Sequence, residues 1–123
     1  MVKRNQVDMF RYSLKNLDEN TKRQFVNQAS NNGWSVLMNC ANDGSLSMAR
    51  EMVANGADVN HSMDTGWTAM HTAAKMSNGP ILEMLLQNGG NKNLLARHRD
   101  FGANLKVEEV TADQRMLDLL QRY

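Results

Sequence analysis

The chain repeats itself at a constant interval of 33 residues. Gly33-Trp34-Ser35 and Gly66-Trp67-Thr68 stand one interval apart. The correspondence runs over residues 33–62 and 66–95 without an insertion or a deletion. A fixed period of this size is typical of a stacked repeat protein, in which each unit is one supersecondary element that buries its apolar face on its neighbours.

Each unit predicts a helix, a turn and a second helix, followed by a projecting hairpin. Ser35 and Thr68 are expected to cap the first helices, because a hydroxyl there accepts a hydrogen bond from a free backbone N–H. The second helices each carry one apolar stripe, and Gly56 and Gly89 are expected to end them in the left-handed conformation. The segment 60–66 is rich in turn residues and predicts a hairpin finger.

These features resemble the ankyrin repeat, whose length is 33 residues. The Thr-Pro-Leu-His motif of that family corresponds to Thr68-Ala69-Met70-His71, and its paired alanines correspond to Ala73-Ala74. Its closing motif is complete at Gly56-Ala57-Asp58-Val59-Asn60. The motif proline is replaced by Val36 and Ala69 in the two units. The resemblance implies an all-α ankyrin-repeat solenoid of stacked helix-turn-helix units with short hairpin fingers.

We expect residues 1–123 to form a single ankyrin-repeat domain, since two repeats alone cannot bury their faces. Its expected parts are an N-terminal capping helix pair at about 6–30, repeats at 31–62 and 63–95, and a degenerate C-terminal capping repeat at 96–123.

Both capping units have recognisable helix signals. Met9, Phe10 and Leu14 are expected to form one apolar face of the N-terminal pair, and Phe25-Val26 the other. At the C-terminal end, Thr111 starts a capping-box pattern before the last helix.

The composition is that of an ordinary globular protein and excludes several classes. No apolar run approaches the length of a membrane span, and the basic first residues have no apolar core after them, so we expect neither a membrane partner nor a signal peptide. The single cysteine, Cys40, excludes an internal disulfide framework and fits a reducing compartment. We therefore expect a cytoplasmic or nuclear location.

The sequence does not predict an enzyme. His61, His71 and His98 have no acidic or cysteine partner at a spacing that makes a catalytic triad or a metal site, so we expect no catalytic residue, metal or cofactor. The resemblance implies that His71 forms hydrogen bonds between loops. Cys40 falls at a close-packed position of the first helix and is expected to be a small core residue.

Trp34 and Trp67 are the most distinctive residues of the two units. In ankyrin repeats the position after the turn glycine belongs to the variable set on the concave side, together with the finger tips and the ends of the first helices. The resemblance therefore implies a partner-binding surface made by Trp34, Trp67, Asn42, Asp43, Met63, Asp64, Lys75, Met76, Asp100 and Phe101. Whether the two indoles contact a ligand or only cover the bases of the fingers is left open.

The expected function is non-catalytic binding of a protein or a short peptide motif on the concave face, as in an adaptor or scaffold. One alternative is binding of a small ligand, a nucleotide or RNA, in which the tryptophans stack on a base and Lys75, Lys92 and Arg97-His98-Arg99 contact phosphate. Another alternative is a homodimer or a larger assembly formed through the same face.

Overall fold

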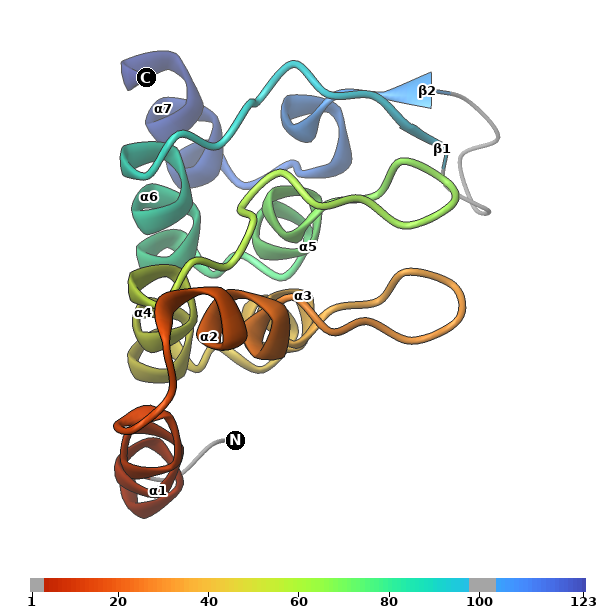
Figure 1. The fold of residues 1–123 in the computed structure, drawn as a ribbon. Coiled ribbons are helices and arrows are strands. Elements are labelled where there is room, and N and C mark those ends of the chain that lie inside the picture. The colour runs from red at the N-terminus through yellow and green to blue at the C-terminus, as the bar shows by residue number, and fades with distance from the viewer. Residues whose placement is uncertain (1–3, 98–103) are drawn as a thin grey trace.

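The computed structural model describes residues 4–97 and 104–123, which form short helices in two stacked columns (Figure 1). In chain order the elements are α1 (Arg4–Leu14), α2 (Glu19–Val26), α3 (Val36–Asp43), α4 (Leu46–Ala54), α5 (Ala69–Lys75), α6 (Gly79–Gln87), β1 (Ala96–Arg97), β2 (Asn104–Leu105), the 3-10 helix η1 (Val107–Val110) and α7 (Gln114–Arg122).

The outer column consists of α1, α4, α6 and α7, and the inner column consists of α3, α5 and η1. Within the units, α3 packs on α4 and α5 packs on α6. The loops before α3 and α5 project from the inner column to one side, and the antiparallel pair β1–β2 projects in the same direction (Figure 1). This arrangement is the helix-turn-helix solenoid with fingers that the repeat predicts.

The inner column depends on the small side chains of α5. Ala73 and Ala74 are fully buried, and α5 packs against α3 on one side and η1 on the other. Side chains of this size let helix backbones approach closely without leaving voids. Thr68 caps the helix as expected, because its Oγ1 accepts a hydrogen bond from the backbone N–H of His71 over 3.3 Å.

The outer column buries the predicted apolar stripes. In α6 the buried residues include Ile81, Leu82, Leu85 and Leu86. Pro80 lies in the first turn, where its missing N–H costs no helical hydrogen bond. Gly56 and Gly89 follow α4 and α6 with φ values of 98° and 90°, which confirms that these helices end in the left-handed conformation.

Two asparagine side chains join successive units by hydrogen bonds to the backbone that follows α4 and α6. The Asn60 amide donates to the Gly89 carbonyl over 3.1 Å and accepts from the Asn91 backbone N–H over 2.7 Å. One interval earlier, Asn27 makes the same two bonds, to the Gly56 carbonyl and from the backbone N–H of Asp58. The 33-residue register therefore extends back to Asn27, and residues 27–33 correspond to the finger at 60–66.

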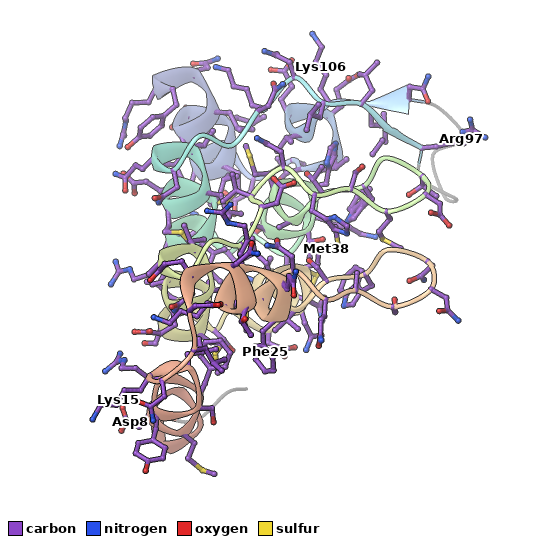
Figure 2. The ribbon with its side chains drawn as sticks, viewed as in Figure 1. Asp8, Lys15, Phe25, Met38, Arg97 and Lys106 are labelled. Atoms are coloured by element: carbon purple, nitrogen blue, oxygen red, sulfur yellow. The ribbon has the colours of Figure 1, made fainter. Side chains whose placement is uncertain are left out.

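The apolar faces of the N-terminal helix pair differ in part from the prediction. Leu14 is buried and Phe10 packs 5.9 Å from the ring of Phe25, but Met9 is 68% exposed, so its predicted burial is wrong. Met9 lies about 140° around the helix from Leu14, the residue that faces the core. Phe25 is also exposed, whereas its neighbour Val26 is buried, and Figure 2 shows the Phe25 ring pointing away from α2 and the fingers.

The last helix starts later than the capping-box pattern predicts. The N-cap of α7 is Asp113, whose carboxylate accepts from the backbone N–H of Arg115 over 3.0 Å. Thr111 instead accepts from the backbone N–H of Asp113 over 3.1 Å and so forms the turn before the helix. The predicted cap at Thr111 is therefore wrong, because a carboxylate two residues later takes the capping role.

Candidate functional site

The two fingers have the same backbone structure. Ser30 and Met63 each donate a backbone hydrogen bond to the carbonyl of the tryptophan that closes the finger, Trp34 or Trp67, over 3.0 and 2.9 Å. The backbone N–H of the turn glycine donates to the carbonyl of that same first residue, from Gly33 to Ser30 and from Gly66 to Met63. The local sequence thus fixes both tryptophans at the base of a finger, immediately before a helix cap.

Consecutive fingers also approach each other closely. A Cβ atom added at Gly33 would lie 2.8 Å from the Cα of Met63, and one added at Gly66 would lie 2.5 Å from the carbonyl oxygen of Leu95. Both glycines have positive φ, so they satisfy the turn and the close approach together. The Nε2 of His61 adds a 2.8 Å hydrogen bond with the Gly33 carbonyl.

Between the fingers and the first helices lies a hollow of about 340 Å³, which we call the Trp hollow. Its walls come from two successive units and from the finger of the next. The lining residues are Trp34, Asn42, Met63, Thr65, Trp67, Thr72, Lys75, Met76 and Arg97. Its size is at the low end of ligand pockets, which span about 300–1,000 Å³.

Trp67 is a buried part of this lining and is only 7% exposed. Its indole Nε1–H donates to Thr72 Oγ1 over 2.8 Å, and its ring centroid lies 5.0 Å from the imidazole of His71. The Thr72 hydroxyl in turn donates to the carbonyl of Thr68 over 3.3 Å. These contacts hold the indole against α5 in one orientation.

The more accessible part of the lining comes from Trp34, which is half-buried, and from Met76, which is exposed at the C-cap of α5. Lys75 places its Nζ 5.9 Å from the centroid of the Trp67 ring, within the range of a cation–π contact. The hollow therefore combines an apolar floor with adaptable thioether and indole groups at its surface.

The structure brings together six of the residues singled out in the sequence. These six line the Trp hollow: Trp34, Asn42, Met63, Trp67, Lys75 and Met76. Asp43 and Asp64 are exposed beside it, at the end of α3 and in the second finger, and are not among its lining residues. Asp100 and Phe101 lie outside the residues that the structure describes.

Thr65 and Thr72 line the hollow but were not among the predicted site residues, and Arg97 was named only as a phosphate contact in the nucleotide alternative. Arg97 follows Asp64 by one 33-residue interval, so the register itself places it in the next finger. The backbone N–H of Arg97 donates to the Thr65 carbonyl over 2.9 Å, which fixes this residue against the preceding finger.

His71 holds the inner column to the next unit. Its Nε2–H donates to the Leu105 carbonyl over 3.0 Å, while Nδ1 accepts from the Thr68 hydroxyl over 2.7 Å. Burial lowers the pKa of the ring, which keeps it neutral in this arrangement. The hydrogen bonds confirm the role between loops that the resemblance implies.

Cys40 is buried within α3 and has a free thiol. Burial raises its pKa to about 11, so the thiolate is scarce near neutral pH. This confirms its expected place in the core.

Within residues 4–97 and 104–123, no group of three or more His, Cys, Asp or Glu residues is arranged to hold a metal ion. No helix in the same ranges is long and apolar enough to cross a membrane.

The repeat length, the stacked columns and the histidine contacts define a class of repeat protein, and comparison with known proteins identifies it. The family description "Ankyrin repeats (3 copies)" matches residues 1–96. The chain belongs to the ankyrin-repeat family.

Individual relatives are more distant. Myotrophin of Xenopus tropicalis is 41% identical over 49 residues, which are 40% of this chain and 42% of that protein. The mouse B-cell lymphoma 3 protein homolog is 28% identical over 89 residues, or 72% of this chain and 19% of its own length. Mouse ankyrin repeat domain-containing protein 40 is 34% identical over 53 residues, or 42% of this chain and 15% of its own length.

Among solved structures, the ankyrin repeat domain of Bcl-3 superposes with a TM-score of 0.72 at 23% identity, over 94% of this chain and 49% of that one. This similarity shows the all-α ankyrin fold. Matches to the curated relatives span less than half of the length of each, from 14% to 42%.

Proposed function

We propose that the chain is a non-catalytic interaction module that binds a protein or a short peptide motif on its concave face, through the fingers and the first helices. Ankyrin-repeat domains are in general interaction modules, and solenoids present extended concave surfaces for this purpose. The observation that supports the site is the Trp hollow, in which two successive units place indole and thioether groups around one concavity.

The proposed anchors differ in accessibility. Trp34 and Met76 form the part of the lining that a partner reaches, whereas Trp67 is almost entirely buried. Aromatic residues in concave, partly desolvated positions supply much of the binding energy of interfaces. Asp43, Asp64, Asp100 and Phe101 are proposed as rim residues that adjust specificity. A free, buried cysteine also supports our proposal of a cytoplasmic or nuclear location.

Affinity capture with the purified chain tests this function. We expect Trp34→Ala to lose specific partners at least about tenfold, because a central aromatic residue contributes about 2 kcal/mol or more to an interface. Tyr12→Ala is the matched control, since Tyr12 is an exposed aromatic residue on α1 and is not among the lining residues of the hollow. Thermal unfolding of both variants shows that they are folded.

Retention of every specific partner by Trp34→Ala would overturn the proposed binding face. The alternatives have their own readouts. A concentration-dependent dimer in light scattering that Trp34→Ala abolishes would favour homo-oligomeric assembly through this face. Quenching of tryptophan fluorescence by oligonucleotides at low salt would favour base stacking, and its absence would exclude it.

A further inference from the structure

The charges around the Trp hollow carry information about its ligand. Among the described residues that line it, the two ionisable ones, Lys75 and Arg97, are both cationic. They come from different units: Lys75 ends α5, and Arg97 belongs to β1 in the finger that follows. The remaining lining residues are apolar or neutral.

Both cations are positioned at the hollow by contacts with its lining residues. The ammonium of Lys75 lies above the Trp67 ring, 5.9 Å from its centroid, so it stands next to the apolar floor. Arg97 is placed by its backbone hydrogen bond to Thr65 in the adjacent finger, and its side chain is exposed at the finger end of the molecule (Figure 2). A negative group bound between them would also contact the neighbouring apolar surface.

The shape of the hollow limits what accompanies that negative group. A concavity of about 340 Å³ accommodates one or two side chains, and its accessible walls are Trp34, Met63 and Met76. Indole and thioether groups pack well on aliphatic or aromatic side chains of varied shape. Asn42 offers an amide that both donates and accepts, which suits the backbone of an extended segment.

We propose that the Trp hollow binds an acidic peptide motif: a large apolar side chain seated against Trp34, Met63 and Met76, with an Asp or Glu one or two positions away whose carboxylate pairs with Lys75 and Arg97. This inference rests on the proposed function and names the ligand chemistry of the same site. The occupant follows from charge complementarity with the lining itself, because its two ionisable residues, Lys75 and Arg97, are cationic, while the carboxylates of Asp43 and Asp64 lie outside the lining.

The experiment begins with selection of a random peptide library on the purified full chain. The selected peptides are then synthesised with each acidic residue replaced by its amide, and binding is measured by fluorescence polarisation. We expect enrichment of apolar residues followed or preceded by Asp or Glu. Replacement of the acid is expected to weaken binding about two- to fivefold, the scale of an exposed charge pair.

A charge-reversal pair gives the matched control. Lys75→Glu/Arg97→Glu is expected to lose the acidic peptides and to accept versions with Lys in place of the acid. Lys15→Glu/Arg50→Glu changes the net charge by the same amount on two exposed residues, one directly after α1 and one in α4, and is expected to bind as the unaltered chain does. Figure 2 shows Lys15 at the opposite end of the molecule from Arg97. Circular dichroism shows that both double variants are folded.

The outcomes separate this inference from the proposed function. Peptide binding that depends on Trp34 but not on the acid would overturn the acidic motif and leave the proposed function intact. Peptide binding that is unaffected by Trp34→Ala would overturn both. Enrichment of no peptide, or a Trp34-dependent response to oligonucleotide phosphate alone, would overturn the acidic motif.

Discussion

Trp67 and Thr72 are joined by a buried hydrogen bond, in which the indole Nε1–H donates to the threonine Oγ1 over 2.8 Å. Both residues line the Trp hollow, yet the bond faces inward, toward α5. Trp67 therefore has a structural role whatever else it contacts. Trp34, one unit earlier, is more exposed, which divides the pair into a supporting and an accessible residue.

A double-mutant cycle measures this bond. Trp67→Phe removes the donor and Thr72→Val removes the acceptor, and each leaves a buried polar atom without its partner. We expect each single variant to lower the free energy of unfolding by about 1–3 kcal/mol and the two to be coupled by about 1 kcal/mol. Urea unfolding followed by circular dichroism provides the values, and additive losses would show that the bond contributes nothing.

Truncation of the two tryptophans is expected to separate stability from binding. Trp67→Ala removes a buried indole and should lower the free energy of unfolding by about 3–5 kcal/mol, whereas Trp34→Ala should cost about half of that or less. Trp34→Ala, in contrast, should lower the affinity for a partner or peptide while the chain is still folded. Equal losses of stability in the two variants would contradict the division of roles.

Gly66 and Gly89 allow a matched test of finger packing. Both have φ near +90°, so alanine is strained at either position. A Cβ at Gly66 would meet the Leu95 carbonyl at 2.5 Å, while a Cβ at Gly89 would meet nothing within 4 Å. Gly89→Ala should therefore cost about 1 kcal/mol, the strain of the left-handed conformation. Gly66→Ala should cost more, and calorimetric melting of both variants checks the difference.

The same pair of variants has a structural readout. Because the clash at Gly66 is with the backbone of the next finger, Gly66→Ala should shift the amide resonances around Leu95–Arg97, which lie across that contact. Gly89→Ala should leave them in place. Similar melting losses and unchanged resonances in both variants would show that the fingers tolerate the extra methyl group.

Much of the fold follows from local signals that recur at one interval. The caps at Ser35 and Thr68 and the glycines after α4 and α6 are set by chemistry within a few residues of chain, so a repeat of the residues predicts a repeat of the structure. The same holds one interval before Asn60: residues 27–33 resemble residues 60–66, and Asn27 makes the same hydrogen bonds as Asn60.

The candidate site was less predictable, because it depends on contacts between units. Arg97, for example, is placed against the hollow by a backbone bond to the preceding finger. The Trp67 indole is instead held within its own unit by Thr72, and Asn39 stands at the equivalent position one interval earlier, so the sequence does contain this difference between the two units. The exposure of Met9 follows from helix geometry once Leu14 is known to face the core, because the two residues lie about 140° apart around the helix.

The Cys40 thiol should react slowly while the chain is folded. Its pKa of about 11 leaves a thiolate fraction at pH 8 that is about two hundredfold smaller than that of an ordinary thiol, and burial further limits access. A colorimetric disulfide reagent should therefore label the protein rapidly in urea and very slowly in buffer. Labelling in buffer at the rate of a free cysteine would show that α3 is accessible in the native state.

The stability of the chain should fall as the pH decreases below about 6.5, the ordinary pKa of histidine. Burial lowers the pKa of His71 in the folded state, so the unfolded chain takes up a proton there at a higher pH than the folded one. Unfolding is therefore favoured below about 6.5, with a limiting slope of about 1.4 kcal/mol per pH unit, until the folded ring is also protonated.

The contribution of His71 is measured by urea unfolding at pH 7.5 and 5.5 for the natural chain and for His71→Asn. The variant should be less stable at both pH values, since it changes the contacts with Thr68 and Leu105, but its stability should depend less on pH. Nitrogen-15 spectra of the imidazole give an independent reading: the folded ring should become charged at a lower pH than the ring of the unfolded chain, and its neutral form should carry the proton on Nε2. A folded imidazole that becomes charged at the same pH as in the unfolded chain, or at a higher pH, would contradict this prediction.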